Sequence, residues 1–364
     1  MTKKLVLKHI SLLALGFLFG PVSFAAAPET AKVEKLEWRG QVGAESLLYL
    51  KPSGLAGTTL FQIPFAGLEL RADLSGGLRA EFELNYQAPV AAGNELNPQR
   101  ANLSTTVGDL RFRAGLFEPA WLEGYEEFWP YDRYSRDLGW FFERWGYLRA
   151  ADYGVELFHR TDGGGFGIAL VNGEGVRASE QGPQKDFHVW GGLDWRNEEG
   201  RRTELLLTAI RGGYENVPSV DAGKERVILS ARSSAPEGWR AGLEAMFTRD
   251  PVDAINAKVV DGTDLLDRGG ERIAGRMGSA TLGYGGARAE AGGRHSLVAR
   301  MDLIEPISGE GDRGVTSTQL LYLYSPTPGA EWLVQISNLD YGDRHSNAIR
   351  DENTWRVSYH VRWD

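Results

Sequence analysis

An alternation with a period of two residues runs through most of this chain and limits its fold more than any other feature. In the last segment, 353–363, an apolar or aromatic residue stands at every second position, with polar or charged residues between them. The same alternation recurs in 77–87, 185–196, 238–248 and 294–304. Because successive side chains of a strand point to opposite faces, each segment has one apolar and one polar face. The chain is therefore predicted to be all-β.

The connections between these segments alternate in length. Short links such as Ser75-Gly76 and Gly108-Asp109 alternate with long ones such as 118–150 and 249–271. Short turns on one rim and long loops on the other are typical of an outer-membrane barrel, in which an even strand number places both chain ends at the short-turn, periplasmic rim. Sixteen strands are predicted, and fourteen or eighteen remain open: 36–50, 60–74, 77–87, 100–107, 110–117, 151–160, 165–172, 185–196, 201–211, 225–233, 238–248, 272–284, 294–304, 315–325, 329–339 and 353–363.

A closed sheet follows from the environment of such strands. An open edge in hydrocarbon leaves backbone groups unpaired at several kcal/mol each, so strand 36–50 is expected to pair with strand 353–363. The alternative is a soluble secreted β-sandwich or propeller. Trp and Tyr near strand ends, a polar face with both signs of charge, and the lack of an internal repeat favour the membrane barrel, whose aqueous interior would carry the polar face.

The N-terminus has the order of an export signal. Lys3, Lys4 and Lys8 precede an apolar stretch from Ile10 to Phe19, and the small residues 25–27 follow. This predicts a signal peptide at 1–26, a short periplasmic segment at 27–35 and a barrel domain at 36–364, exported through the periplasm to the outer membrane. An anchor helix that stays attached is the alternative.

Composition excludes several functions. The 364 residues include no cysteine, so disulfides and thiol chemistry are ruled out, and the net charge of -9 argues against nucleic-acid partners. The histidines lie in no catalytic or zinc-binding motif, and the sequence predicts no catalytic residue, no metal site and no cofactor. An outer-membrane hydrolase is the enzymatic alternative, with His188 beside Asp186 as its only candidate pair.

The longest loop, 118–150, is rich in aromatic residues, including Trp121, Trp129, Trp140 and Trp145. An exposed lid would not need this much apolar surface, so the loop is predicted to fold into the barrel and narrow the pore. A loop attached to the rim or to a neighbouring subunit is the alternative. Charges at a constriction set ion preference. The predicted constriction charges are Arg133, Arg136, Arg144, Glu126 and Glu127.

Strand parity assigns charged residues to the pore wall. A basic strip formed by Arg111, Arg113, Arg226, Arg232 and Arg240 is predicted to face an acidic wall, which would place a transverse field across the channel. Charges that only solvate a wet wall are the alternative. The acidic wall comprises Glu69, Asp73, Glu81 and Glu83.

One stretch resembles a known family. Arg113-Ala114-Gly115-Leu116-Phe117-Glu118-Pro119, then Phe141-Phe142-Glu143-Arg144 and Asp152-Tyr153-Gly154-Val155, resembles the phosphate-selective porins of Gram-negative bacteria over 113–155. The resemblance implies a sixteen-stranded, usually trimeric barrel whose third loop enters the pore. That family relies on lysines and arginines for anion selectivity, whereas few lysines remain in the predicted strands here, so the fold is carried over and the phosphate substrate is not.

The sequence thus predicts a non-enzymatic porin embedded in outer-membrane lipid as a homotrimer. It would pass small inorganic ions or polar solutes by passive diffusion, with anions or phosphate as an open preference. A sugar-specific channel, in which loop aromatics form a stacking track, is the alternative.

Overall fold

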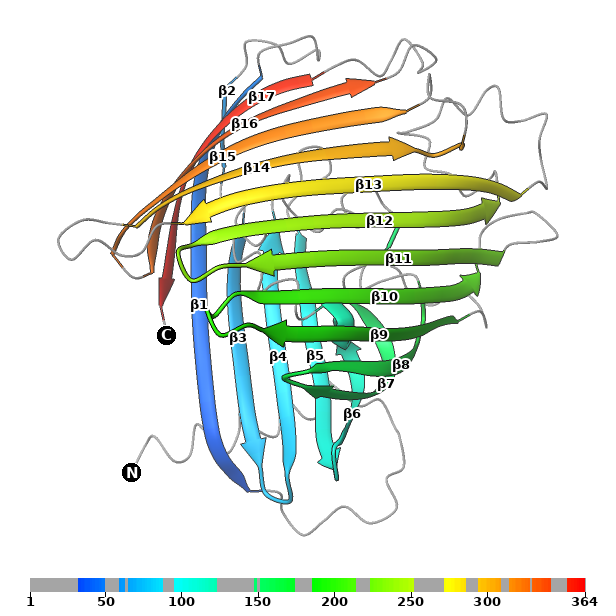
Figure 1. The fold of residues 1–364 in the computed structure, drawn as a ribbon. Helices are drawn as coiled ribbons and strands as arrows, with labels where there is room; N and C mark the ends of the chain where they lie inside the picture. Colours follow the sequence, from blue (N-terminus) through cyan, green and yellow to red (C-terminus); the bar gives the residue numbers. More distant parts are fainter. Residues whose placement is uncertain are drawn as a thin grey trace, which may run out of the picture.

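The computed structural model describes residues 32–49, 59–62, 65–87, 95–122, 147–148, 151–173, 185–213, 223–251, 272–285, 294–308, 314–327, 329–341 and 352–363. Within them, seventeen strand segments form one antiparallel sheet (Figure 1). They are β1 (Val33–Tyr49), β2 (Thr59–Gln62), β3 (Phe65–Leu74), β4 (Leu78–Gln87), β5 (Glu95–Val107), β6 (Leu110–Phe117), β7 (Asp152–Thr161), β8 (Gly164–Val171), β9 (Asp186–Arg196), β10 (Arg202–Gly213), β11 (Gly223–Ser234), β12 (Trp239–Pro251), β13 (Arg272–Gly285), β14 (Arg294–Glu305), β15 (Val315–Thr327), β16 (Ala330–Tyr341) and β17 (Glu352–Trp363).

The sheet closes on itself into a barrel of sixteen strands. β2 and β3 both pair with the same side of β1 and together make one barrel strand, which reconciles seventeen segments with sixteen. The other side of β1 pairs with β17 from Gly40–Trp363 to Tyr49–Thr354. The predicted fold class, the strand number and the pairing of the first strand with the last are therefore confirmed.

The closing seam has a specific contact at the short-turn rim. A Cβ atom on Gly40 would lie 2.3 Å from the Trp363 ring, so only a glycine leaves room for this indole. Trp363 is the last strand residue and covers the backbone where β17 meets β1. Closure and the aromatic C-terminus are thus linked in one cross-strand pair.

Two strand predictions differ from the structure. The strand predicted at 60–74 is divided into β2 and β3. β5 begins at Glu95, five residues before the predicted start at 100, because a register shift opposite Glu83 and Leu84 accommodates Pro98. Because a proline cannot donate a hydrogen bond to the neighbouring strand, the sequence Asn97-Pro98 predicts a loop. In the structure the bulge keeps these two residues within β5.

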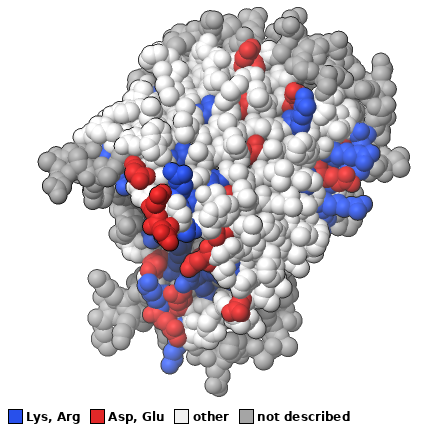
Figure 2. All heavy atoms as spheres, in the orientation of Figure 1, with Lys and Arg blue, Asp and Glu red and all other residues white. Residues whose placement is uncertain are grey.

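The two faces of the sheet differ as the alternation predicts. On β12, Leu243 and Phe247 point outward and are 64% and 51% exposed, whereas their neighbours Glu244 and Met246 point inward and are buried. Over β10–β14 the outer surface is largely uncharged in Figure 2. Among the described residues, no helix is long and apolar enough to cross a membrane.

Aromatic side chains encircle the outside of the short-turn rim. Trp195, Trp239, Trp332 and Trp363 are each 42–51% exposed and lie at strand ends next to the short turns. Trp239 packs on Tyr284 and Trp332 packs on Tyr359, with ring centroids 4.7 and 4.5 Å apart. Such belts mark the level of a membrane–water interface.

Candidate pore and the base of the long loop

Both described ends of the long loop lie inside the barrel. After β6 the chain makes a helical turn at 120–122, and Ala120, Trp121 and Leu122 are at most 4% exposed. They belong to one apolar cluster with inward residues of β7–β16 and with Leu148 at the other end of the loop. The Tyr147 ring lies 5.9 Å from the Arg226 guanidinium on β11. The base of the loop therefore turns toward the lumen.

The rest of the loop, 123–146, lies outside the described residues, and with it the predicted constriction charges. These are Glu126, Glu127, Arg133, Arg136 and Arg144. Their place at a constriction stays a prediction.

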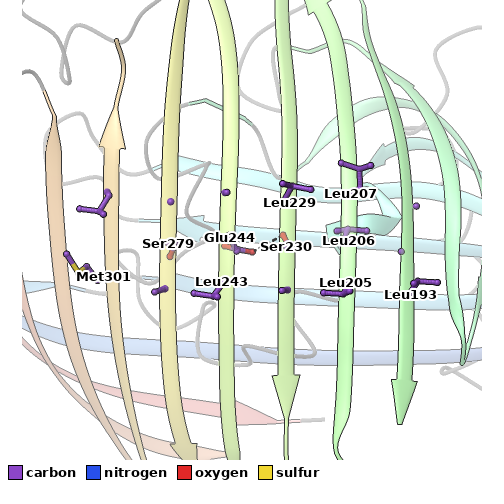
Figure 3. Close-up of a pocket in the computed structure, with 17 residues that line it drawn as sticks. Leu193, Leu205, Leu206, Leu207, Leu229, Ser230, Leu243, Glu244, Ser279 and Met301 are labelled. Carbon is purple, nitrogen blue, oxygen red and sulfur yellow. Dashed lines mark hydrogen bonds between the residues drawn. The ribbon is translucent and has the colours of Figure 1, made fainter. Parts of the chain in front are cut away.

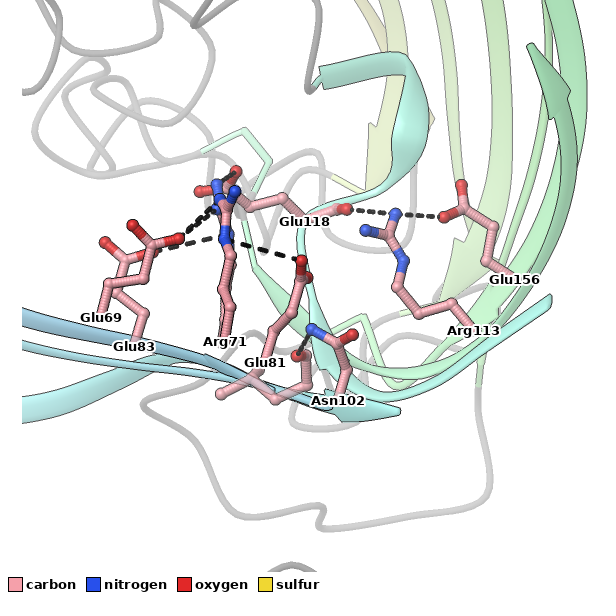
Figure 4. A network of polar contacts seen from close by, with 10 residues as sticks. Glu69, Arg71, Glu81, Glu83, Asn102, Arg113, Glu118 and Glu156 are labelled. Carbon is pink, nitrogen blue, oxygen red and sulfur yellow. Dashed lines mark hydrogen bonds and ion pairs between the residues drawn. The ribbon is translucent and has the colours of Figure 1, made fainter. Parts of the chain in front are cut away.

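A buried ion pair holds the base of the loop to the wall (Figure 4). Arg113 on β6 donates to the Glu156 carboxylate on β7 and to the Glu118 carbonyl oxygen, 2.7 Å away. The other Glu156 oxygen accepts the backbone N–H of Ala120 at 2.8 Å. Both side chains are almost fully buried, at 3% and 1% exposed. Removing either partner would leave the other charge uncompensated in a buried site.

Gly115 permits this arrangement of β6. Its φ is +119°, which side-chain-bearing residues rarely adopt, and a Cβ there would lie 2.4 Å from the Ala101 carbonyl oxygen on β5. The glycine lies two residues after Arg113 and two before Phe117. It therefore lets β6 lie close against β5 at the point where the chain begins to leave the wall.

The residues of the predicted acidic wall lie on β3 and β4, and each contacts an arginine. Arg71 contacts Glu69 at 2.6 Å and Glu81 at 3.8 Å. Arg100, in the middle of β5, reaches Glu83 at 3.5 Å, Glu69 at 3.9 Å and the loop residue Glu118 at 2.6 Å. Asp73, nearer the short turns, pairs with Arg79 at 2.7 Å.

Sequence reasoning missed Arg100, which connects this wall to the loop. The signal for it was present, because Arg100 shares the parity of the inward residues Asn102 and Ser104. Glu118 gave no comparable signal, since it lies past the end of β6, where alternation stops.

The predicted basic residues are divided between two places. Arg226 and Arg232 lie inward on β11 and Arg240 on β12, half the barrel away from β3 and β4 in strand order. Arg226 pairs with Asp250, and Arg232 reaches Glu204 at 3.5 Å and Glu244 at 3.2 Å. These acids offset the positive charge of β11.

The remaining two, Arg111 and Arg113, lie on β6, much nearer the acidic wall. Arg111 lines a polar recess of about 560 Å³ toward the short-turn rim, together with Asp73, Arg79, Asp109 and Arg160. Its guanidinium lies 5.8 Å from the Phe158 ring. The five arginines therefore do not form one continuous strip.

The inner wall of β10–β16 carries apolar residues among its polar ones, which the prediction of a polar inner face did not include. Inward residues of β10–β16 form a buried cluster with the base of the loop. The sequence could not show this, because a wall covered by a loop and a wall facing water both occupy inward positions. The inward apolar residues include Leu206, Ile210, Ile228, Met246, Ile273, Met277, Val298, Ile304, Val315, Leu321, Leu323 and Leu333.

The described residues offer little for enzyme chemistry. No group of three or more His, Asp or Glu side chains among them could hold a metal ion. His188 is 5% exposed, lies 6.4 Å from the Trp121 ring, and neither of its ring nitrogens has a hydrogen-bond partner among these residues. A general base needs such a partner or access to a substrate.

Solved structures with a similar architecture include outer-membrane porins. An anion-selective porin from Comamonas acidovorans matches with a TM-score of 0.56 at 12% identity, over 90% of this chain and 99% of that one. Salmonella typhi OmpF, in a complex with daunomycin, matches with a TM-score of 0.60 at 12% identity, over 92% and 100%. Pseudomonas putida OprB matches with a TM-score of 0.61 at 9% identity, over 90% and 94%.

These similarities define the fold class as that of the outer-membrane porins. The identities are too low to carry a substrate across from any of the three. No protein-family model matches the chain, and the comparison with curated proteins gives no match. The structural neighbours therefore support the porin part of the resemblance, and the phosphate-selective family is not confirmed.

Proposed function

We propose that this chain forms an outer-membrane channel for the passive diffusion of small inorganic ions and polar solutes. The observation that carries the proposal is the closed barrel whose outer face is apolar and whose inner face holds ionised side chains at β3–β7 and β11. A sixteen-stranded barrel is wide enough to leave an aqueous channel. The porin neighbours support the same function.

The channel is proposed to be weakly ion-selective. The described inward arginines Arg71, Arg100, Arg113, Arg226 and Arg232 each contact at least one carboxylate, which offsets their attraction for anions. A strong preference for phosphate would instead need cationic groups that face the solute without such partners. An anion preference, where one exists, is expected to come from Arg111, which is half-buried in the polar recess.

The sugar-track alternative is less well supported by the described residues. Trp121 is 3% exposed and packs against the wall, so its ring cannot stack on a passing sugar. For a hydrolase, the isolated ring of His188 lacks the hydrogen-bonded base and orienting group that nucleophilic catalysis needs. We accordingly propose that the chain is not an enzyme.

Assembly and export complete the proposal. Residues 1–26 are proposed to be a signal peptide and residues 27–35 to begin the periplasmic side of the mature chain, whose first strand starts within that segment at Val33. Outer-membrane OmpT of Vibrio cholerae, a neighbour at 11% identity and a TM-score of 0.55, is described as a trimer form, and we propose a homotrimer for this chain.

Conductance in planar bilayers tests the channel directly. The purified, refolded chain is expected to give stepwise current in KCl, with a small reversal potential in a salt gradient. Deletion of 125–145 should raise the single-channel conductance if the loop narrows the pore. A folded barrel that passes no current would contradict the channel, and unchanged conductance after the deletion would contradict the constriction.

A further inference from the structure

Arginines gather on the outer face of the barrel near the long-loop rim of β10–β13. Arg211, Arg249 and Arg276 are exposed, and their strand neighbours Ile210, Thr248 and Met277 point inward and are buried. The cross-strand register places Arg211 opposite Glu225 and Glu225 opposite Arg249, so three charged residues lie in one row across three strands. Arg272, at the start of β13, extends this cluster. We call these four arginines the outer arginine cluster.

The arginines of the cluster outnumber the glutamates beside them in the described strands. Arg276 pairs with Glu305 at 2.7 Å, and Arg272 reaches Glu225 at 3.4 Å. Arg211 and Arg249 form no ion pair with another residue in the described part of the chain. Among the described strand residues, the four arginines of the cluster stand beside two glutamates, on a surface that the proposed function places in a membrane. An arginine on the lipid face of a barrel is unfavourable unless it reaches the interface, where it can meet an anion.

The opposite rim differs in kind. There the outer face carries Trp195, Trp239, Tyr284 and Trp332. Uncharged aromatic rings suit an interface without a specific anion, whereas guanidinium groups suit phosphate, which they bind with paired N–H donors. On the outer face, therefore, Trp and Tyr rings predominate beside the short turns, and the arginine cluster lies on the long-loop side, which faces the cell exterior in an outer-membrane barrel.

An apolar depression lies on the same strands, toward the middle of the barrel wall (Figure 3). Its volume is about 900 Å³. Small residues form part of it on both sides of the paired Leu207 and Leu229, with Gly191 on one side and Ala245 and Gly278 on the other. Arg211 lies four positions after Leu207, and Arg249 lies four positions after Ala245. Four positions correspond to about 13 Å along a strand. An acyl chain whose headgroup sat at the cluster would reach this depression.

We propose that the outer arginine cluster and this depression together bind a phosphate-bearing lipid of the outer leaflet. Arg211 and Arg249 would donate hydrogen bonds to its phosphate oxygens, and its acyl chains would lie over the small residues of β10–β13. The guanidinium groups select an anionic headgroup, and the depression selects a lipid over free phosphate. This inference rests on the proposed membrane barrel and adds a ligand to its outer face.

Native mass spectrometry of the full refolded chain in micelles tests the site, with diphosphorylated lipid A as the probe and phosphatidylcholine as the neutral reference. The barrel is expected to retain lipid A in preference to phosphatidylcholine. Arg211→Gln with Arg249→Gln should weaken retention about tenfold, because two charge-assisted contacts are lost. Arg201→Gln with Arg294→Gln, two exposed arginines at the short-turn rim, is the matched control and should retain lipid A like the parent.

Two further variants separate the parts of the proposal. Ala245→Leu with Ala280→Leu fills the depression without changing charge, and it should weaken retention of lipid A while leaving the arginines in place. Each variant is also measured for conductance. Two results would overturn this inference and leave the channel intact. In the first, a conducting parent barrel retains lipid A and phosphatidylcholine equally. In the second, the Arg211/Arg249 variant and the Arg201/Arg294 control variant lose lipid A to the same extent. A folded parent without conductance would overturn the channel instead.

Discussion

The inner walls of β3–β6 and of β13–β15 follow the same alternation and differ in how many apolar residues they carry. On β3–β6 the inward positions hold ion-paired residues such as Glu69, Arg71 and Arg113. On β13–β15 many of them hold residues such as Met277, Val298 and Leu321, which pack in the cluster that also contains the base of the loop. A period of two fixes which face a side chain meets, but the contents of the lumen decide whether that face is wet.

The difference also indicates how the channel is arranged. The aromatic end of the loop packs on the apolar wall, while Glu118 extends to Arg100 on the charged wall. Polar solutes are therefore expected to pass along β3–β6, where charged groups can replace part of their hydration. The variants below test this division, beginning with the largest expected effect.

The buried pair on the charged wall should be the most sensitive point. Glu156→Leu leaves Arg113 buried without its carboxylate and removes the acceptor for the Ala120 N–H. A loss of about 3–5 kcal/mol in the free energy of unfolding is expected. Urea titration of the barrel in micelles measures it. Glu81→Gln, on a less buried side chain, is the control, and equal stability of the two variants would contradict the buried role of Glu156.

On β15, two adjacent leucines allow the stability contribution of an inward and an outward residue to be compared. Leu321 points inward and is fully buried, while Leu320 points outward and is 46% exposed. Leu321→Ala should cost about 2–5 kcal/mol because it leaves a cavity. Leu320→Ala should cost less than half as much, because lipid or detergent fills the space. The same urea titration compares them, and equal losses would show that the inner wall of β15 is open to water.

Ion selectivity should depend on the charged residues of β3–β6 and not on the inner wall of β15. Glu69→Gln with Glu83→Gln removes two acids that contact Arg71 or Arg100, so the reversal potential in a KCl gradient should shift toward anions. Ser317→Asn, on the buried wall of β15, should leave the reversal potential unchanged. The absence of a shift in the double variant would place the conducting path elsewhere.

Barrel assembly should respond more weakly to changes at the seam between β1 and β17, which lies between the two walls. Trp363→Ala exposes the backbone at Gly40 and removes the last aromatic residue, so it should slow barrel assembly more than deletion of Asp364. Heat-modifiable migration on gels follows the folded fraction over time. The reverse ranking would argue against the register of the closing strands.

The sequence by itself determined the fold class and the inward or outward side of residues such as Glu69, Arg226 and Leu243, and it favoured sixteen strands over fourteen or eighteen. These follow from local geometry, since alternation and turn length depend only on neighbouring residues. Tertiary structure alone decided that Arg100 meets Glu118, that Arg113 is buried with Glu156, and that Met277 and Leu321 are buried in one apolar cluster with the base of the loop. Those contacts join residues far apart in the chain, and their existence depends on how the closed barrel brings the strands and the base of the loop together.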